Sequence, residues 1–189
     1  MEVVRVLVER GADINKADDY GFTPLYIASS FGHLEIVRFL VERGADINKA
    51  RDNGVTPLYI ASGEGHVEVV RVLVERGADI NKATNNGYTP LFIASQNGHV
   101  EVVRVLAERG ADINKASNEG WTPLIIASGR GHVEVVRILV ERGADINKAM
   151  NDGATPLEAA IRHNHTEIIR LLERAQAQQS SKKKSFEKK

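Results

Sequence analysis

Histidine is the side chain of this sequence that could most readily do chemistry, and it recurs at a fixed spacing. A histidine follows a glycine every 33 residues, at His33, His66, His99 and His132. Imidazole is a common zinc ligand, but this spacing predicts one histidine on each of four stacked units, whose helices lie roughly 8 to 10 Å apart. These histidines cannot share one ion, so we expect them to satisfy backbone groups at a turn.

The other candidate groups for catalysis are as weak. Serines recur with the same period and are predicted to fill small packing positions, at Ser29, Ser62, Ser95 and Ser128. His163 and His165 break the period, but an i,i+2 spacing does not place them on one helical face. The sequence has no phosphate-binding glycine motif, no His-Glu-x-x-His and no Gly-x-Ser-x-Gly. We therefore predict a protein that is not an enzyme, with no catalytic residue, metal site or cofactor.

The chain repeats one unit. Gly-x-Thr-Pro-Leu occurs five times, in a constant step of 33 residues that starts at Gly21 and ends at Gly153. The first four copies lead into a Gly-His-(Val/Leu)-Glu-(Val/Ile)-Val-Arg segment that ends in Glu-Arg-Gly-Ala-Asp-Ile-Asn-Lys-Ala. Self-similarity at a period of 20 to 50 residues is typical of stacked repeat proteins.

Each unit predicts two short helices and an extended finger. In the first complete unit, Thr23 suits an N-cap and Pro24 the first helical position, so a helix is predicted from Pro24 to about Phe31. A second helix is predicted from His33 to Arg43, with Gly44 as a left-handed stop, and residues 45–54 read as a loop or hairpin finger. Helices this short are marginal alone, so neighbouring units must bury their apolar faces.

This pattern resembles the ankyrin-repeat family over about residues 1 to 175. The resemblance implies an all-α solenoid of helix-turn-helix units with β-hairpin or loop fingers. The family usually has His after Thr-Pro-Leu, whereas this chain has Tyr26, Tyr59, Phe92, Ile125 and Glu158, which predicts apolar packing in place of a histidine network. The expected divisions are a partial repeat at 1–17, repeats at 18–50, 51–83, 84–116 and 117–149, a capping repeat at 150–176, and a basic disordered tail at 177–189.

The two ends of the array are predicted to differ. Residues 1–17 match only a second helix and a finger, which favours a fragment or an edited chain over a frayed half-repeat, and the uncapped N-terminal face could self-associate. At the other end, Thr155 and Glu158 predict a capping box.

Differences between units gather on the finger and the first helix, whereas the second helix hardly changes. Eight of the ten aromatic residues occupy these variable positions, and a constant scaffold with a changing face suggests recognition of a partner. In the ankyrin-repeat family, fingers and first helices line a concave groove that binds other proteins. The predicted partner-binding residues are Phe22, Tyr26, Phe31, Arg51, Val55, Tyr59, Glu64, Tyr88, Phe92, Asn97, Glu119, Trp121, Ile125 and Arg130. For Tyr26, Tyr59 and Phe92, packing between adjacent first helices is the alternative.

Composition limits the partner to another protein or peptide. The chain has 25 basic and 25 acidic residues, but five lysines and one glutamate lie in the last eight residues, so the body is net acidic and should not bind nucleic acid. No apolar run is long enough to span a membrane, and cysteine is absent. A cytoplasmic protein is expected, with nuclear location possible through the lysine run.

Three alternatives stay open from the sequence. The chain could be a regulatory or targeting arm of a larger enzyme or channel, or an engineered repeat scaffold without a natural ligand. The lysine run could also be the main functional element, as a nuclear-import signal or an anchor to an acidic surface.

Overall fold

The computed structural model describes the backbone of residues 2–186 and the side chains of residues 2–181. In this part of the chain there are eleven α-helices and no β-strand. Helix α1 (Glu2–Glu9) comes first, and the others follow as pairs of a first and a second helix. The pairs are α2 (Pro24–Ser30) with α3 (Leu34–Glu42), α4 (Pro57–Gly63) with α5 (Val67–Glu75), α6 (Pro90–Asn97) with α7 (Val100–Glu108), α8 (Pro123–Arg130) with α9 (Val133–Glu141), and α10 (Pro156–Arg162) with α11 (Thr166–Phe186).

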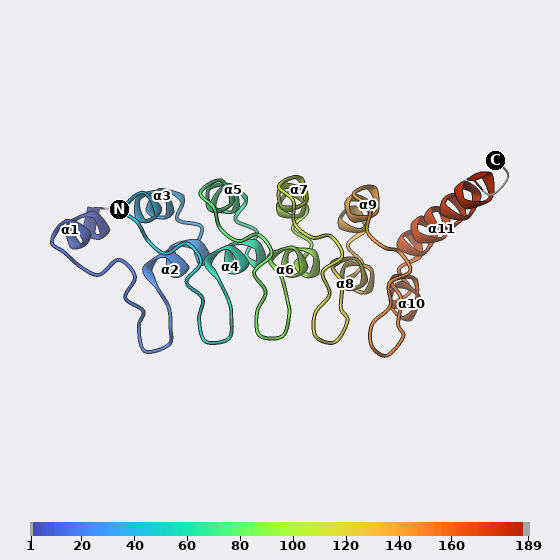
Figure 1. Cartoon of the computed structure of the whole chain (residues 1–189), viewed down its shortest axis with the longest axis horizontal. Helices are drawn as coiled ribbons and strands as arrows, with labels where there is room; N and C mark the ends of the chain where they lie inside the picture. Colours follow the sequence, from blue (N-terminus) through green and yellow to red (C-terminus); the bar gives the residue numbers. More distant parts are fainter. Residues whose placement is uncertain (1, 187–189) are drawn as a thin grey trace.

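The pairs stack side by side in an elongated array (Figure 1). First helices form one row, second helices form another, and the fingers project on the side of the first helices. This is the predicted all-α solenoid. The predicted hairpins are not strands: the second finger closes with a backbone bond from Arg51 N to Val55 O at 3.0 Å, but no strand ladder forms in the described residues.

Each first helix starts where its threonine and proline predict. In α4, the Thr56 hydroxyl accepts a hydrogen bond from Tyr59 N at 3.1 Å, and the proline that follows lacks the N–H that would otherwise be unpaired. In α10 the predicted capping box is present, with Glu158 Oε2 accepting from Thr155 N at 2.8 Å. The second helices are a residue shorter at each end than predicted, because His33 and Arg43 are the N-cap and C-cap of α3.

The core runs through the whole stack as repeating layers. The leucine after each Thr-Pro is at most 1% exposed in the first four units, and so is the leucine in the middle of each of their second helices. These leucines are Leu25, Leu58, Leu91 and Leu124 in the first helices, and Leu40, Leu73, Leu106 and Leu139 in the second. Burying one such side chain stabilises the fold by about 1.5 to 3 kcal/mol, so stacking supplies what a seven-residue helix lacks.

The periodic histidines tie each unit to the one before it. Their Nε2 atoms donate to a backbone carbonyl at the C-terminal end of the preceding first helix: His66 to Ser30 at 2.9 Å, His99 to Gly63 at 2.8 Å, His132 to Gln96 at 2.9 Å and His165 to Gly129 at 3.1 Å. Those carbonyls would otherwise lack a helical partner. The predicted role in satisfying backbone groups is confirmed, and the bond also spans two units.

Close packing at this bond explains a glycine. Gly65 has a φ of +76°, and a Cβ placed on it would lie 2.7 Å from His99 Nδ1. A larger residue would therefore push the imidazole away from its carbonyl.

The finger motif Asp-Ile-Asn-Lys forms a second link between units. Asn48 Oδ1 accepts from Asp79 N of the next unit at 2.8 Å, and Lys82 Nζ donates to the Asn48 carbonyl at 3.1 Å. The same pair of bonds recurs at Asn15, Asn81 and Asn114. The fingers are thus held in a fixed register.

The predicted disordered tail is wrong for residues 177–186, because α11 continues to Phe186. Alanine, glutamine and lysine are good helix formers, and they make up most of this segment. The lysine run proposed as an anchor has its side chains, and residues 187–189, outside the described residues. No described helix has the length and apolar character that crossing a membrane requires.

The links between units predict an uneven effect of histidine replacement. His99→Ala removes the bond to Gly63 and leaves a carbonyl without its partner, so we expect the free energy of unfolding to fall by about 1 to 3 kcal/mol. His33 is exposed and makes no such bond within the described residues, so His33→Ala should cost less than about 0.5 kcal/mol. Urea unfolding followed by circular dichroism measures both. Equal losses for the two variants would contradict the proposed role of the bond.

Candidate functional site

The groups with catalytic potential do not converge. No cluster of three or more His, Cys, Asp or Glu side chains that could hold a metal ion occurs in the described residues. The four periodic serines are 0% exposed, and two of them donate to helix carbonyls, Ser62 to Leu58 and Ser95 to Leu91, both at 2.7 Å. The serines therefore have the predicted packing role.

Aromatic side chains form a row along the fingers and first helices. At the start of the array, the Phe22 and Tyr26 ring centroids lie 5.1 Å apart, and the guanidinium of Arg51 from the next finger lies 4.1 Å above the Phe22 ring. The same guanidinium donates to the Tyr20 carbonyl through Nε and Nη2, each at 3.2 Å. Arg51 thus fixes the aromatic residues of one unit from the finger of the next.

The row continues through the middle of the array. Tyr88 and Phe92 stack with centroids 4.5 Å apart and planes inclined by 22°. Burial of Tyr59 is the main reason that its pKa is raised to about 12, with further contributions from Tyr88 and Tyr26. A phenol hydroxyl loses hydration at this position, so its ionised form is disfavoured. The tyrosines of three neighbouring units therefore share one local environment.

At the C-terminal end the same face is hollowed. A cavity of about 570 Å³ lies between the fourth and fifth pairs, with Trp121 and Met150 from two fingers, Arg130 at the end of α8, and Arg162 and His163 at the end of α10 among its lining residues. Trp121 is half-buried, and its Nε1 donates to Glu119 Oε2 at 3.2 Å. This hollow combines apolar walls with cations at its edge.

The predicted partner-binding residues separate into three groups by burial. Phe31, Glu64, Asn97, Glu119 and Arg130 are exposed, and Phe22, Arg51, Val55, Tyr59, Tyr88 and Trp121 are half-buried. Tyr26, Phe92 and Ile125 are 7%, 4% and 0% exposed. A partner cannot make extensive contact with these last three, so predicting them as contacts was wrong. They pack within the array, which was the alternative for Tyr26 and Phe92.

Sequence reasoning missed part of the hollow. Met150, Arg162 and His163 line it but were not predicted as contacts. Each stands at a position that varies among the units: Met150 corresponds to Arg51, and His163 corresponds to Phe31. Comparing the last unit with the others, position by position, would have found them.

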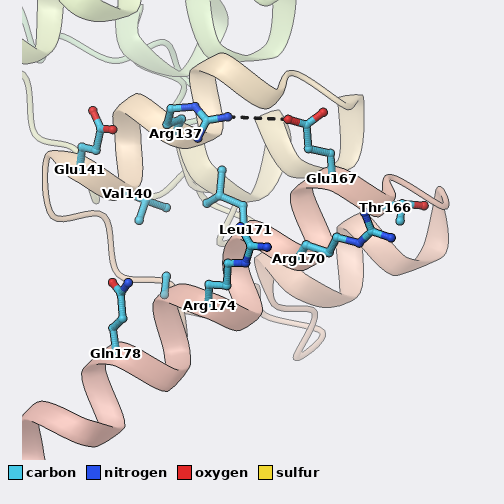
Figure 2. A pocket seen from close by; sticks show the side chains of 10 residues that line it. Arg137, Val140, Glu141, Thr166, Glu167, Arg170, Leu171, Arg174 and Gln178 are labelled. Carbon is cyan, nitrogen blue, oxygen red and sulfur yellow. Dashed lines mark ion pairs between the residues drawn. The ribbon is translucent and has the colours of Figure 1, made fainter.

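A second groove lies on the side of the second helices, between α9 and α11, with a volume of about 650 Å³ (Figure 2). Earlier units bridge this side with ion pairs, such as Arg109–Glu75 at 2.8 Å and Arg142–Glu108 at 2.9 Å. The next such pair would join Glu141 to position 175, which is alanine. Arg137 bridges to Glu167 at 3.7 Å instead. This groove marks where the ladder of ion pairs ends.

Burial of Tyr59 predicts its behaviour at high pH. The folded-state pKa of about 12 exceeds the ordinary value of about 10, so the contribution of Tyr59 to stability is complete below pH 10 and is lost as pH rises to about 12. A spectrophotometric titration of the four tyrosines should show a late phenolate, and Tyr59→Phe should remove it. Persistence of the late phase in Tyr59→Phe would assign it to another tyrosine.

Comparison with protein-family models gives matches along most of the chain. A model described as ankyrin repeats in three copies matches residues 47–117 and 111–183, and one described as ankyrin repeats in many copies matches residues 1–41. A search of curated proteins found no match. Ankyrin repeats generally mediate protein–protein interactions and are typically non-catalytic, and the family models detect no other kind of domain. With its stacked helix pairs and these matches, the chain belongs to the ankyrin-repeat family.

Proposed function

We propose that this protein is a non-catalytic scaffold that binds another protein or peptide on the face made by its fingers and first helices. One observation carries the proposal: the side chains that differ between units line this one face. The half-buried aromatic residues among them are Phe22, Tyr59, Tyr88 and Trp121. Aromatic side chains with an apolar body and a polar edge are the commonest anchors of protein interfaces.

The hollow beside Trp121 suggests what the partner contributes there. Its walls include Ile126 and Met150, which favour an apolar side chain. Arg130 and Arg162 are both exposed at its edge. We propose that the partner inserts an apolar side chain next to a carboxylate, so that the guanidinium groups receive a charge-assisted hydrogen bond. Glu119 and Asp152 on the same side would disfavour partners with a basic residue at that place.

The face should bind with little rearrangement. Capped first helices, stacked Tyr88 and Phe92, and the Arg51 bridge hold the row before any partner arrives. Preorganised side chains lose less conformational entropy on binding than mobile ones, which leaves more of the contact energy as affinity.

Charge reversal at the hollow tests the proposal. Partners captured by the wild-type chain and identified by mass spectrometry are measured by titration calorimetry against Arg130→Glu and Trp121→Ala. We expect affinity to fall at least about tenfold for each variant, while the melting temperature of Arg130→Glu stays within about 2 °C of wild type because the side chain is exposed.

The matched control is Arg170→Glu, an exposed arginine of the groove on the side of the second helices. It should leave affinity unchanged. A partner that is lost with Arg170→Glu and kept by both hollow variants would place binding on the opposite side and refute the proposal.

A further inference from the structure

The N-terminal end of the array has a vacant place beside its first complete unit. A groove of about 340 Å³ lies between α1, α2 and α3, and its lining is mainly apolar. The side chains that form it include Val4, Phe22, Pro24, Ile27, Ile36 and Leu40. This groove is separate from the hollow beside Trp121 and lies at the opposite end of the array.

The same side chains are covered wherever a first helix precedes them. Pro57 and Pro90 are buried, but the equivalent Pro24 is exposed. Val69, Val102 and Val135 are at most 2% exposed, but the equivalent Ile36 is only half-buried. Ile27 is 40% exposed, against 8% for its equivalent Ile126. The first helices α2, α4, α6 and α8 each pack against the next first helix, and only α2 has no first helix before it in the described residues.

His33 marks the same vacancy with a polar group. His66, His99, His132 and His165 each donate to a carbonyl at the end of the preceding first helix. His33 lines the groove, is exposed, and has no such carbonyl partner among the described residues.

The finger beside the groove is already in place. Asn15 accepts from Asp46 N at 2.7 Å, and Lys49 donates to the Asn15 carbonyl at 2.8 Å, as in every later unit. Helix α1 stands where a second helix belongs, but it buries no residue, and Val3 and Leu7 are 71% and 54% exposed. A second helix and a finger are therefore present, and a first helix is what this place lacks.

We propose that this groove docks a short helix supplied by another polypeptide, with the chemistry of this protein's own first helices. The interface between units, repeated four times, continues into the groove and defines the occupant. Its inner face carries leucine and alanine, as Leu58 and Ala61 do in α4. A glycine near its end allows close approach, because a Cβ on Gly63 would lie 3.0 Å from Ile93 of the next unit. A carbonyl of its last turn accepts from His33.

The docked helix extends the array by completing its first half-repeat. It would cover Leu7 and Val4 on one side and Pro24 and Ile27 on the other, so the partner stabilises both α1 and the first complete unit. This role does not depend on the face of fingers and first helices, and partners at the two places could bind together.

A peptide of residues 54–65, which contains α4, is the probe. Amide chemical shifts of the labelled chain should change in a saturable manner in α1, α2 and α3 and not at the finger tips. With the peptide at five times its Kd, the melting temperature should rise by about 2 to 4 °C. The matched control peptide carries Ala61→Glu, which places a charge on the buried face, and it should have no effect.

Two variants of the chain test the groove itself. Ile27→Glu should weaken peptide binding at least about tenfold, because it puts a carboxylate on the apolar wall. Its control is Ile161→Glu, a change at a side chain that is 51% exposed on α10, and this variant should bind like wild type. His33→Ala should weaken binding about threefold to tenfold by removing one hydrogen bond.

A tethered form removes the objection that a free peptide is too unstructured to bind. Joining residues 54–65 to the N-terminus through a flexible Gly/Ser linker gives an effective concentration on the order of 1 mM. Unchanged shifts in α1–α3 for this form would overturn the proposal. So would equal binding by Ile27→Glu and wild type, or sedimentation of the wild-type chain as a dimer whose α1–α3 surface is already covered by a second copy.

Discussion

The hydrogen bond from a histidine to the preceding first helix is the interaction on which the array depends. A helix of seven residues does not persist in water alone, and its last carbonyls have no partner within the helix. His99 supplies one of those partners from the next unit, at 2.8 Å from the Gly63 carbonyl. Local helix formation and stacking are thereby coupled, because a first helix is completed by the unit that follows it. The Asn48–Asp79 link does the same for the fingers.

This coupling separates the residues that hold the array from those that are free to vary. Histidine, glycine and the Asp-Ile-Asn-Lys motif lie between units, where a change disturbs two units at once. Residues at the finger tips and on the outer side of the first helices have neighbours mainly along their own row. Asn97 shows how the two sets meet, since its side chain donates to the Gly63 carbonyl at 2.8 Å yet stays exposed. The face can change without loss of the stack, which is the physical basis for proposing it as the binding face.

Local signals in the sequence were sufficient for most of the fold. Threonine, proline and glycine fix where helices begin and end through contacts within a few residues, so those boundaries could be predicted to within a residue. The burial of Phe92 and Ile125 could not, because it depends on packing against first helices 33 residues away. The hollow was recognised only in part for the same reason, since Met150 and Trp121 come from different fingers. The helix through residues 177–186 was missed because polar composition was given more weight than helix propensity.

The two ends of the array follow from one rule, that each unit needs a neighbour on both sides. At the C-terminal end, Glu158 replaces an aromatic or aliphatic residue and caps its own helix through Thr155 N, so α10 is completed without a following unit. The ladder of ion pairs also ends there, because alanine at position 175 leaves Glu141 without the arginine that earlier units supply. At the N-terminal end no comparable substitution occurs in the first complete unit: Pro24, Ile27 and His33 keep the residue types that elsewhere contact a preceding helix. One end is adapted to solvent and the other keeps the surface of an interior unit, which is why an additional helix fits at that end alone.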